Sequence, residues 1–320
     1  MNDPDIELMT EISALYYLQD ITQEELSQRY KTSRSKIWRI LKRAREAGIV
    51  DIQVRANPNM AKHLEDEFKR RFGLGRLFAA IDHPNPATQR AAVASLVANH
   101  LDNVLVDDMI VAVGMGRNVS AITDAFGTPR PRNVIFASAL GGSVRGGETI
   151  NADHIARRLA TRFGGRSETL YAPALVSNSR LREELINNET VKGTLDRARR
   201  ADIALIGLGD LSEDSNLIRM GWFSSQEMTS ARVRGTVGDM MGHDLIDIEG
   251  RPSGGMEGRV IGLTMSELRA IPNVVAIASE GTKTAIILAA LRTGTVNSLA
   301  TSLANAAAVI DLDDATPKAR

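Results

Sequence analysis

Apolar runs that alternate with helical patterns constrain the fold of this chain more than any other feature of its sequence. The runs lie at 77–81, 109–113, 133–140, 168–173 and 203–208, with helical patterns between them at 86–104, 118–126, 151–163 and 179–199. More runs follow a loop-rich region, at 259–264, 274–279 and 298–312, with a helical pattern at 282–292. Such alternation is typical of strand–helix–strand units. We predict an α/β domain with a Rossmann-like, mainly parallel sheet, which binds ligands at the carboxyl ends of its strands.

Three shorter helical patterns precede this region. Residues 6–19 place Ile6, Met9, Ile12, Leu15 and Leu18 at helical spacing. Thr22 and Glu25 are spaced as a capping box for a second helix that ends near Tyr30, and Ser33 is the next good cap, for a helix through about Ala47 that Gly48 stops. The alternating stretch 49–54 predicts a short strand. This order is that of a small winged helix-turn-helix.

The length of 320 residues favours two domains, and Asn57-Pro58-Asn59 is the natural break between them. We predict that residues 1–57 form the winged helix-turn-helix DNA-binding domain and residues 58–320 the effector-binding and oligomerisation domain. The charged helical pattern at 60–72 is interpreted as a connector or an oligomer contact rather than part of either core.

Charge is balanced over the whole chain, with 39 basic and 39 acidic residues, but not locally. The segment from Arg29 to Arg45 carries eight basic residues and no acidic one. In a helix-turn-helix, side chains near the start of the second helix of the motif reach DNA. Helical spacing predicts that six residues in this part of the third helix are exposed: Ser33, Arg34, Ser35, Lys36, Trp38 and Arg39. A solvated basic helix is the alternative, but capping, core spacing and a wing together favour DNA. For Trp38, packing on the wing and contact with DNA are equally supported.

Several classes of protein are disfavoured by what the sequence lacks. There is no cysteine, so disulfides, thiolate metal sites and cysteine nucleophiles are excluded, and none of the five histidines has another at metal-binding spacing. We therefore expect neither a metal nor a cofactor. No apolar run approaches the roughly 18 residues that span a bilayer, and the amino terminus does not resemble a secretory signal. We expect a cytoplasmic protein without a membrane partner.

Glycine turns follow three of the predicted strands. They contain Gly114 and Gly116, then Gly141 and Gly142, then Gly207 and Gly209, and the first continues into Arg117, Asn118 and Ser120. Glycine lets a backbone approach a ligand, and amides at a helix start bind anions such as a sugar phosphate. A single turn is equally well explained by tight packing, whereas three at one sheet edge favour a ligand crevice. None reads Gly-x-Gly-x-x-Gly, which disfavours a nicotinamide dinucleotide.

Taken in order, the motifs of the chain resemble the SorC-type (sugar-binding-domain) transcriptional regulators. The resemblance covers residues 12–312 and is carried by SRSKIWRILKRAREAGIVDIQV, VAVGMGRNVS, ASALGGS, DIALIGLGDL, RGTVGDMMGHDLIDIEGR and VIGLTMSELRAIPNVVAIASEGTKTAIILAALRTGTVNSLAT. It implies a carboxy-terminal domain similar to phosphosugar isomerase and CoA-transferase-like folds, used as a sensor in a homotetramer or dimer. It also implies double-stranded operator DNA and a small sugar phosphate or polyol as partners. Repression that the effector relieves is the default direction of control, because catabolic sugar regulators of this type often work in that way.

The resemblance also implies an effector site. To the glycine turns with Arg117, Asn118 and Ser120 it adds Asp239, Asp247 and Lys283, and we expect Lys283, at a helix start, to hold the phosphate. Asp239 could instead terminate a loop, and Lys283 could be solvated.

Three positions depart from the family pattern, which usually has threonine at Asn118, a second glycine at Glu280 and aspartate at Ser302. A carboxylate at Glu280 would repel an anion. The effector is therefore either a sugar phosphate or an uncharged polyol, and the sequence leaves both alternatives open.

Two other functions compete with a ligand-controlled regulator. A phosphosugar isomerase would draw an acid and a base from Asp210, Asp239 or Asp247 with His243. An architectural DNA-binding module would ignore ligands. The recognition helix has no use in an isomerase, so we predict that the chain is not an enzyme and has no catalytic residues. The sequence leaves the sugar, the operator and the direction of control undetermined.

Overall fold

The computed structural model describes residues 3–50, 58–125, 127, 129–143, 148–213, 215–254 and 258–316. Contacts divide the chain into two compact units, one formed mainly by Met1–Val54 and the other by nearly all of the chain from Arg55 onward. The predicted boundary between residues 57 and 58 adjoins residues that are not described and stays a prediction. No helix in the described ranges is long and apolar enough to cross a membrane.

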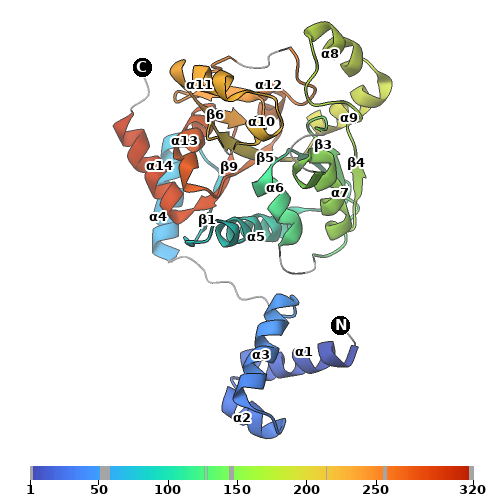
Figure 1. Ribbon diagram of the computed structural model, residues 1–320, viewed down its shortest axis with the longest axis vertical. Helices are drawn as coiled ribbons and strands as arrows, with labels where there is room; N and C mark the ends of the chain where they lie inside the picture. Colours follow the sequence, from blue (N-terminus) through green and yellow to red (C-terminus); the bar gives the residue numbers. More distant parts are fainter. Residues whose placement is uncertain are drawn as a thin grey trace. The chain divides into compact units, whose positions relative to one another are not determined.

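The described residues of the first unit form three helices, α1 (Asp3–Leu18), α2 (Gln23–Arg29) and α3 (Arg34–Glu46) (Figure 1). The expected caps are confirmed: Thr22 and Glu25 form a capping box, and Ser33 Oγ accepts a hydrogen bond from the Lys36 amide at 3.2 Å. The core is formed by apolar side chains from all three helices, namely Ile12, Leu15, Leu26, Ile37 and Leu41.

Two expectations for this unit are not met in full. Ile6 and Leu18 were predicted on the buried stripe of the first helix, but they are 39% and 81% exposed, whereas Met9, Ile12 and Leu15 between them are buried. The predicted wing begins with a bend at Ile49 and Val50, and its residues 51–54 lie outside the described residues.

The second unit is built on a parallel sheet, as predicted. Its strands, in spatial order, are β1 (Arg76–Ala80), β9 (Ser298–Ser302), β8 (Asn273–Ile277), β5 (Ile203–Asp210), β2 (Ile110–Val113), β3 (Ile135–Ser138) and β4 (Arg166–Glu168). The chain runs from β2 through β3 to β4 at one edge, and from β5 through β8 to β9 toward the other. The strand order therefore reverses between β2 and β5, and ligands of such sheets bind outside the carboxyl ends of the strands at this point.

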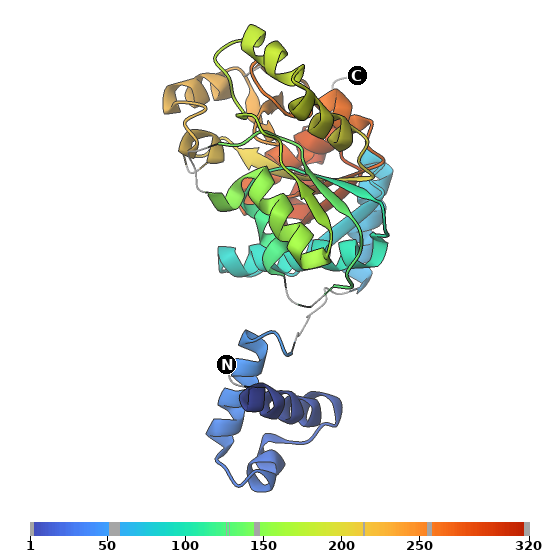
Figure 2. The ribbon, with the colours of Figure 1, turned by 90° about the vertical axis from the view of Figure 1, so that its right-hand side faces the viewer.

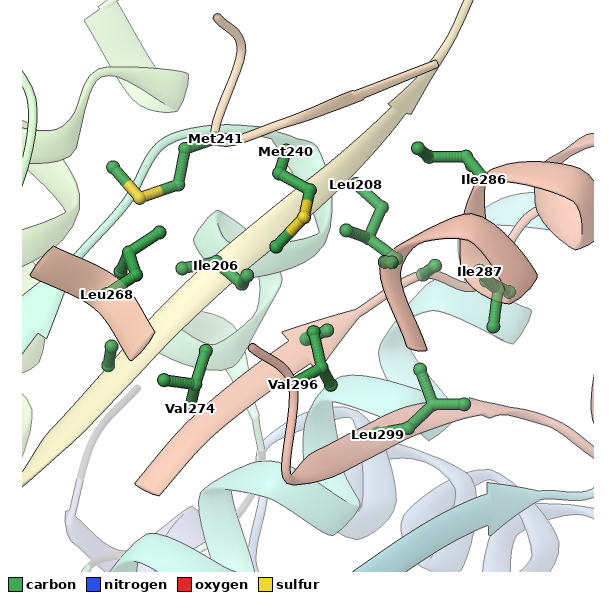
Figure 3. Close-up of a cluster of buried hydrophobic side chains, with 14 of the residues drawn as sticks. Ile206, Leu208, Met240, Met241, Leu268, Val274, Ile286, Ile287, Val296 and Leu299 are labelled. Atoms are coloured by element: carbon green, nitrogen blue, oxygen red, sulfur yellow. The ribbon is translucent and has the colours of Figure 1, made fainter. Parts of the chain in front are cut away.

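Helices cover both faces of the sheet (Figures 1 and 2). Alternate residues of β5 point to opposite faces: Ile203 and Leu205 join one core, Ile206 and Leu208 the other. The first core is covered by α5 (Pro86–Val104), α6 (Arg117–Ala121) and α7 (Ala152–Phe163). The second is covered by α4 (Pro58–Phe72), α9 (Glu189–Arg199), α13 (Thr284–Arg292) and α14 (Leu303–Ala315), and Figure 3 shows part of its packing.

An antiparallel hairpin extends β5 where the sequence predicted only loops. It consists of β6 (Thr236–Met240) and β7 (Asp244–Asp247), and β6 pairs with β5 so that Asp239 lies opposite Gly209. Its strands are only five and four residues long, and their pairing has a register shift between Thr236 and Gly238, so period-two patterning could not reveal them.

The remaining described elements are short. They are α8 (Ser179–Ile186), α10 (Asn216–Arg219), α11 (Ser225–Val233), α12 (Met265–Arg269) and the 3₁₀ turns η1 (Ile122–Asp124), η2 (Glu148–Ile150) and η3 (Gly281–Lys283).

Three predicted elements need correction. The run 168–173 mostly follows its strand, because β4 ends at Glu168. The helix expected at 179–199 is two helices, since Asn188 caps a new one by accepting a hydrogen bond from the Thr190 amide at 3.1 Å. The run 259–264 makes only isolated bridges, such as Gly262 to Leu140, and is no strand of the sheet.

Helix α4 was interpreted as a connector, and this interpretation is wrong. Leu64 and Phe68 are 6% and 0% exposed and belong to the main core of the second unit. Arg71 donates hydrogen bonds to Asp313 at 3.2 Å and Asp314 at 2.5 Å on α14. The apolar stripe of α4 thus has a partner in the same chain, which the sequence pattern could not identify.

We expect Phe68→Ala to lower the free energy of unfolding of the second unit by about 3–5 kcal/mol, because it leaves a cavity in a packed core. Met60→Ala on the same helix is the matched control: Met60 is 47% exposed, so its loss is expected within about 0.5 kcal/mol. Urea denaturation of the full chain, followed by circular dichroism, measures both. Equal small losses would show that α4 is not part of this core.

Candidate functional site

The six side chains predicted to reach DNA all lie exposed on α3 or at its cap: Ser33, Arg34, Ser35, Lys36, Trp38 and Arg39. Arg34 forms an ion pair with Glu24 at 3.5 Å, but both side chains are more than half exposed, so water screens it and the pair is weak. Arg39 Nε donates to the Ser35 carbonyl at 3.3 Å within the same helix. Both guanidinium groups therefore stand at a surface where a phosphate could bind them.

Two of these six residues also have structural contacts. Ser33 caps α3, and its hydroxyl lies 3.0 Å from that of Ser35. Trp38 is 49% exposed, with Lys42 Nζ 5.6 Å from its ring centroid, a distance that permits a cation–π contact. The packing of Trp38 on the predicted wing involves residues outside the described ranges.

A small cavity lies at the carboxyl ends of β2 and β5, where the strand order reverses. Its volume is about 40 Å³, room for a few water molecules. Seven of the predicted effector-site residues line it: Gly116, Arg117, Asn118, Gly207, Gly209, Asp239 and Lys283. Its other lining residues are Met115, Leu208, Gly242, Asn216 and Leu217. The first three lie within the motifs noted in the sequence but were not predicted as site residues, and no sequence signal pointed to Asn216 or Leu217.

Glycine is required at two positions of this cavity for different reasons. Gly116 has φ +117°, a conformation that side chains rarely adopt, at the turn into α6. At Gly209 a Cβ atom would lie 2.0 Å from Asp239 Oδ2. The absence of a side chain at Gly209 therefore makes room for the Asp239 carboxylate.

Five predicted residues lie outside the cavity wall and have other contacts. The Gly114 amide donates to the Leu205 carbonyl at 2.8 Å, and the Ser120 hydroxyl donates to the Thr149 carbonyl at 2.8 Å. Gly141 packs closely against residues 172–174, and its amide donates to the Ile261 carbonyl at 2.9 Å. The Gly142 amide donates to the Ala172 carbonyl at 2.9 Å.

Asp247 also lies outside, at the far end of the β6–β7 hairpin from Asp239. Its carboxylate accepts hydrogen bonds from the amides of Glu249 at 3.0 Å and Arg251 at 2.9 Å and closes the following turn.

Glu280 is the centre of a partly buried charge cluster beside the cavity. Its carboxylate lies 2.9 Å from Lys283 Nζ and accepts hydrogen bonds from Asn118 Nδ2 at 2.8 Å and Arg90 Nη2 at 3.0 Å. Burial alone would raise the pKa of Glu280, but the Lys283 ammonium and these hydrogen bonds hold it well below its usual range. Lys283, expected to hold a phosphate, is thus paired within the chain. Nothing in the sequence indicated the role of Arg90.

Asp239 is the other buried acid of the cavity, 3% exposed. Its Oδ1 accepts a hydrogen bond from the Gly242 amide at 2.6 Å. Burial raises the pKa of Asp239 to about 6, although that hydrogen bond and the charges of Lys283 and His243 act in the opposite direction. The His243 ring lies against two carbonyl groups, with Nε2 3.1 Å from the Leu263 oxygen and Nδ1 3.4 Å from the Met241 oxygen.

We expect Asp239→Asn to change the pH dependence of stability. Because folding raises this pKa from 3.8 to about 6, protonated Asp239 stabilises the fold fully below pH 3.8 and this contribution is lost as the pH rises through 6. Asparagine does not titrate, so the stability of the variant relative to wild type should increase by about 2 kcal/mol between pH 4.5 and 7.5. Urea unfolding at both pH values measures this, and a constant difference would contradict it.

Comparison with known proteins gives a consistent result. Residues 57–311 match the family model described as "Putative sugar-binding domain". A crystal structure with the same domain name, from a transcriptional repressor of Vibrio fischeri, is 46% identical, covers 79% of this chain and 99% of its own, and superimposes with a TM-score of 0.73. The full-length sorbitol operon regulator SorC from Klebsiella pneumoniae is 27% identical, with 97% and 100% coverage and a TM-score of 0.78.

A relative compared by sequence alone agrees with these structures. The transcriptional regulator LsrR from Klebsiella pneumoniae is 28% identical, over 96% of this chain and 93% of its own length. The family model covers well over half of the chain. The chain is therefore a member of the SorC-type family of transcriptional regulators, which carry a sugar-binding domain.

Proposed function

We propose that this chain represses a carbohydrate or polyol catabolic operon by binding its operator, and that a sugar-like effector releases it. The observation that carries the proposal is the union, in one chain, of an exposed basic face on α3 with a polar cavity at the point where strand order reverses. Named relatives that regulate transcription, one of them a sorbitol operon, support it.

The first part of the proposal is a DNA interface on α3. Arg34, Lys36 and Arg39 lie near the amino-terminal end of the second helix of the motif, the part that meets base edges in the major groove. Ser33, Ser35 and Trp38 border them, and Lys42 and Arg43 extend the positive surface. A homodimer or homotetramer would present such helices in pairs to half-sites about one helical turn, or a multiple of it, apart.

The second part is an effector in the cavity. Asn118, Asp239 and Asn216 give its wall the hydrogen-bonding groups that fix a sugar. Because about 40 Å³ is less than a sugar occupies, we infer that the effector binds a more open arrangement of the cavity. Tighter binding to that arrangement would shift the population toward it.

The competing isomerase receives little support from the cavity. His243 and Asp247 do not line it, and Asp210 accepts hydrogen bonds from Ser212 at 2.6 Å and Thr282 at 2.5 Å. We propose that the chain has no catalytic activity. Turnover of any member of a panel of sugar phosphates would instead support the isomerase function. If sugars, polyols and their phosphates all failed to raise the melting temperature, a ligand-independent DNA-binding module would be favoured.

We expect Arg34→Ala to weaken binding to the operator by about 1–3 kcal/mol if Arg34 contacts a base, with effector binding unchanged. Fluorescence anisotropy with DNA from upstream of the gene, and with random DNA, measures the loss. Arg180→Ala, at an exposed side chain of the second unit, is the control and should bind as wild type. An equal loss on random DNA would assign Arg34 to a phosphate, and no loss on either DNA would contradict the interface.

Lys283→Ala is expected to abolish the response of DNA binding to the effector and to leave DNA affinity itself unchanged. The reason is that Lys283 lines the cavity and holds Glu280. Lys192→Ala, an exposed lysine on α9, should respond as wild type. The same anisotropy assay, carried out with and without the sugar to which wild type responds, measures this effect. A normal response of Lys283→Ala would show that Lys283 is not part of the effector site.

A further inference from the structure

We propose that the effector of this cavity is an uncharged sugar or polyol, and that Glu280 is the specificity residue that excludes phosphate esters. This inference rests on the proposed function of the cavity as the effector site. It identifies the chemical class of the effector, which that function left undecided.

The cationic groups beside the cavity already have an anionic partner. Lys283 Nζ lies 2.9 Å from one Glu280 oxygen, and Arg90 Nη2 donates to the other at 3.0 Å. The side chains of Glu280 and Lys283 are only 17% and 9% exposed. A phosphate that approached Lys283 would meet the Glu280 carboxylate at close range in a poorly solvated place, where like charges repel strongly.

Nearby charges do not offset this repulsion. Asp239 lines the same cavity, and the carboxylate of Asp210 lies 2.5 Å from Thr282 Oγ1, next in sequence to Lys283. Near the cavity, the three basic groups of Arg90, Arg117 and Lys283 are accompanied by three carboxylates, those of Asp210, Asp239 and Glu280. A phosphate dianion finds no excess of positive charge here.

The polar wall suits hydroxyl groups instead, because a hydroxyl both donates and accepts a hydrogen bond. The Asp239 carboxylate can accept from a hydroxyl. Asn216 Oδ1, also in the cavity wall, is buried and has no hydrogen-bond partner among the described residues. A buried acceptor of this kind is stabilised by a donor from the ligand.

Calorimetric titration of the full-length chain with inorganic phosphate tests the exclusion directly. Wild type should show no binding up to the highest phosphate concentration used, whereas Glu280→Gln, which keeps the shape of the side chain and removes its charge, should bind phosphate at least about tenfold more tightly than this detection limit. Glu184→Gln removes an exposed carboxylate on α8 and should behave as wild type. Equal phosphate affinity of wild type and Glu280→Gln would overturn the proposal.

A second measurement needs no variant. Wild type is titrated with D-glucitol, D-fructose and the 6-phosphate of each. Tighter binding of a free compound than of its phosphate supports the proposal, and tighter binding of a phosphate overturns it. Operator binding is measured separately by anisotropy, so a chain that fails to bind operator would refute the proposed function while the phosphate titration still decides the role of Glu280.

Discussion

Parallel pairing of β2 with β5 is the constraint on which the rest of the second unit depends. It brings together two turns that are about ninety residues apart in sequence, and the reversal of strand order there places their carboxyl ends around one cavity. The junction is tight: a Cβ atom at Gly114 would lie 2.8 Å from the Leu205 oxygen, and one at Gly207 would lie 2.8 Å from the Met115 oxygen. Because these glycines have no side chain, the backbone segments that form the wall of the cavity can pack in direct contact.

Electrostatic compensation shapes the cavity itself. Buried charges are stable only when they are paired and hydrogen-bonded, and Glu280 meets this requirement through Lys283, Arg90 and Asn118 at once. Asp239 has a single amide donor in Gly242, and its pKa is raised accordingly. Two neighbouring carboxylates thus differ in charge state near pH 6 because their partners differ.

The three-helix unit follows from local rules, and for that reason the sequence predicted it well. Caps at Thr22 and Ser33 depend on contacts three residues apart, and the core positions Leu26, Ile37 and Leu41 follow from helical spacing. The hairpin β6–β7 and the docking of α4 depend on partners far away in the sequence, and neither was predicted. Asp247 shows the same limit: its motif resembled a site, but the hairpin carries it to the end opposite Asp239.

By itself the sequence determined the class of fold and the order of most strands and helices. It also identified the exposed basic face of α3 and seven of the residues around the cavity. These features could be predicted because periodicity, capping and glycine turns depend on residues that are close together in the sequence. Only the tertiary structure decided how the charges pair. Arg90 and Asn118 meet Glu280 across separations of 190 and 162 residues. Such contacts depend on strand order and helix packing. For that reason only the structure shows that Glu280, which departs from the family pattern, is the counter-ion of Lys283 and Arg90.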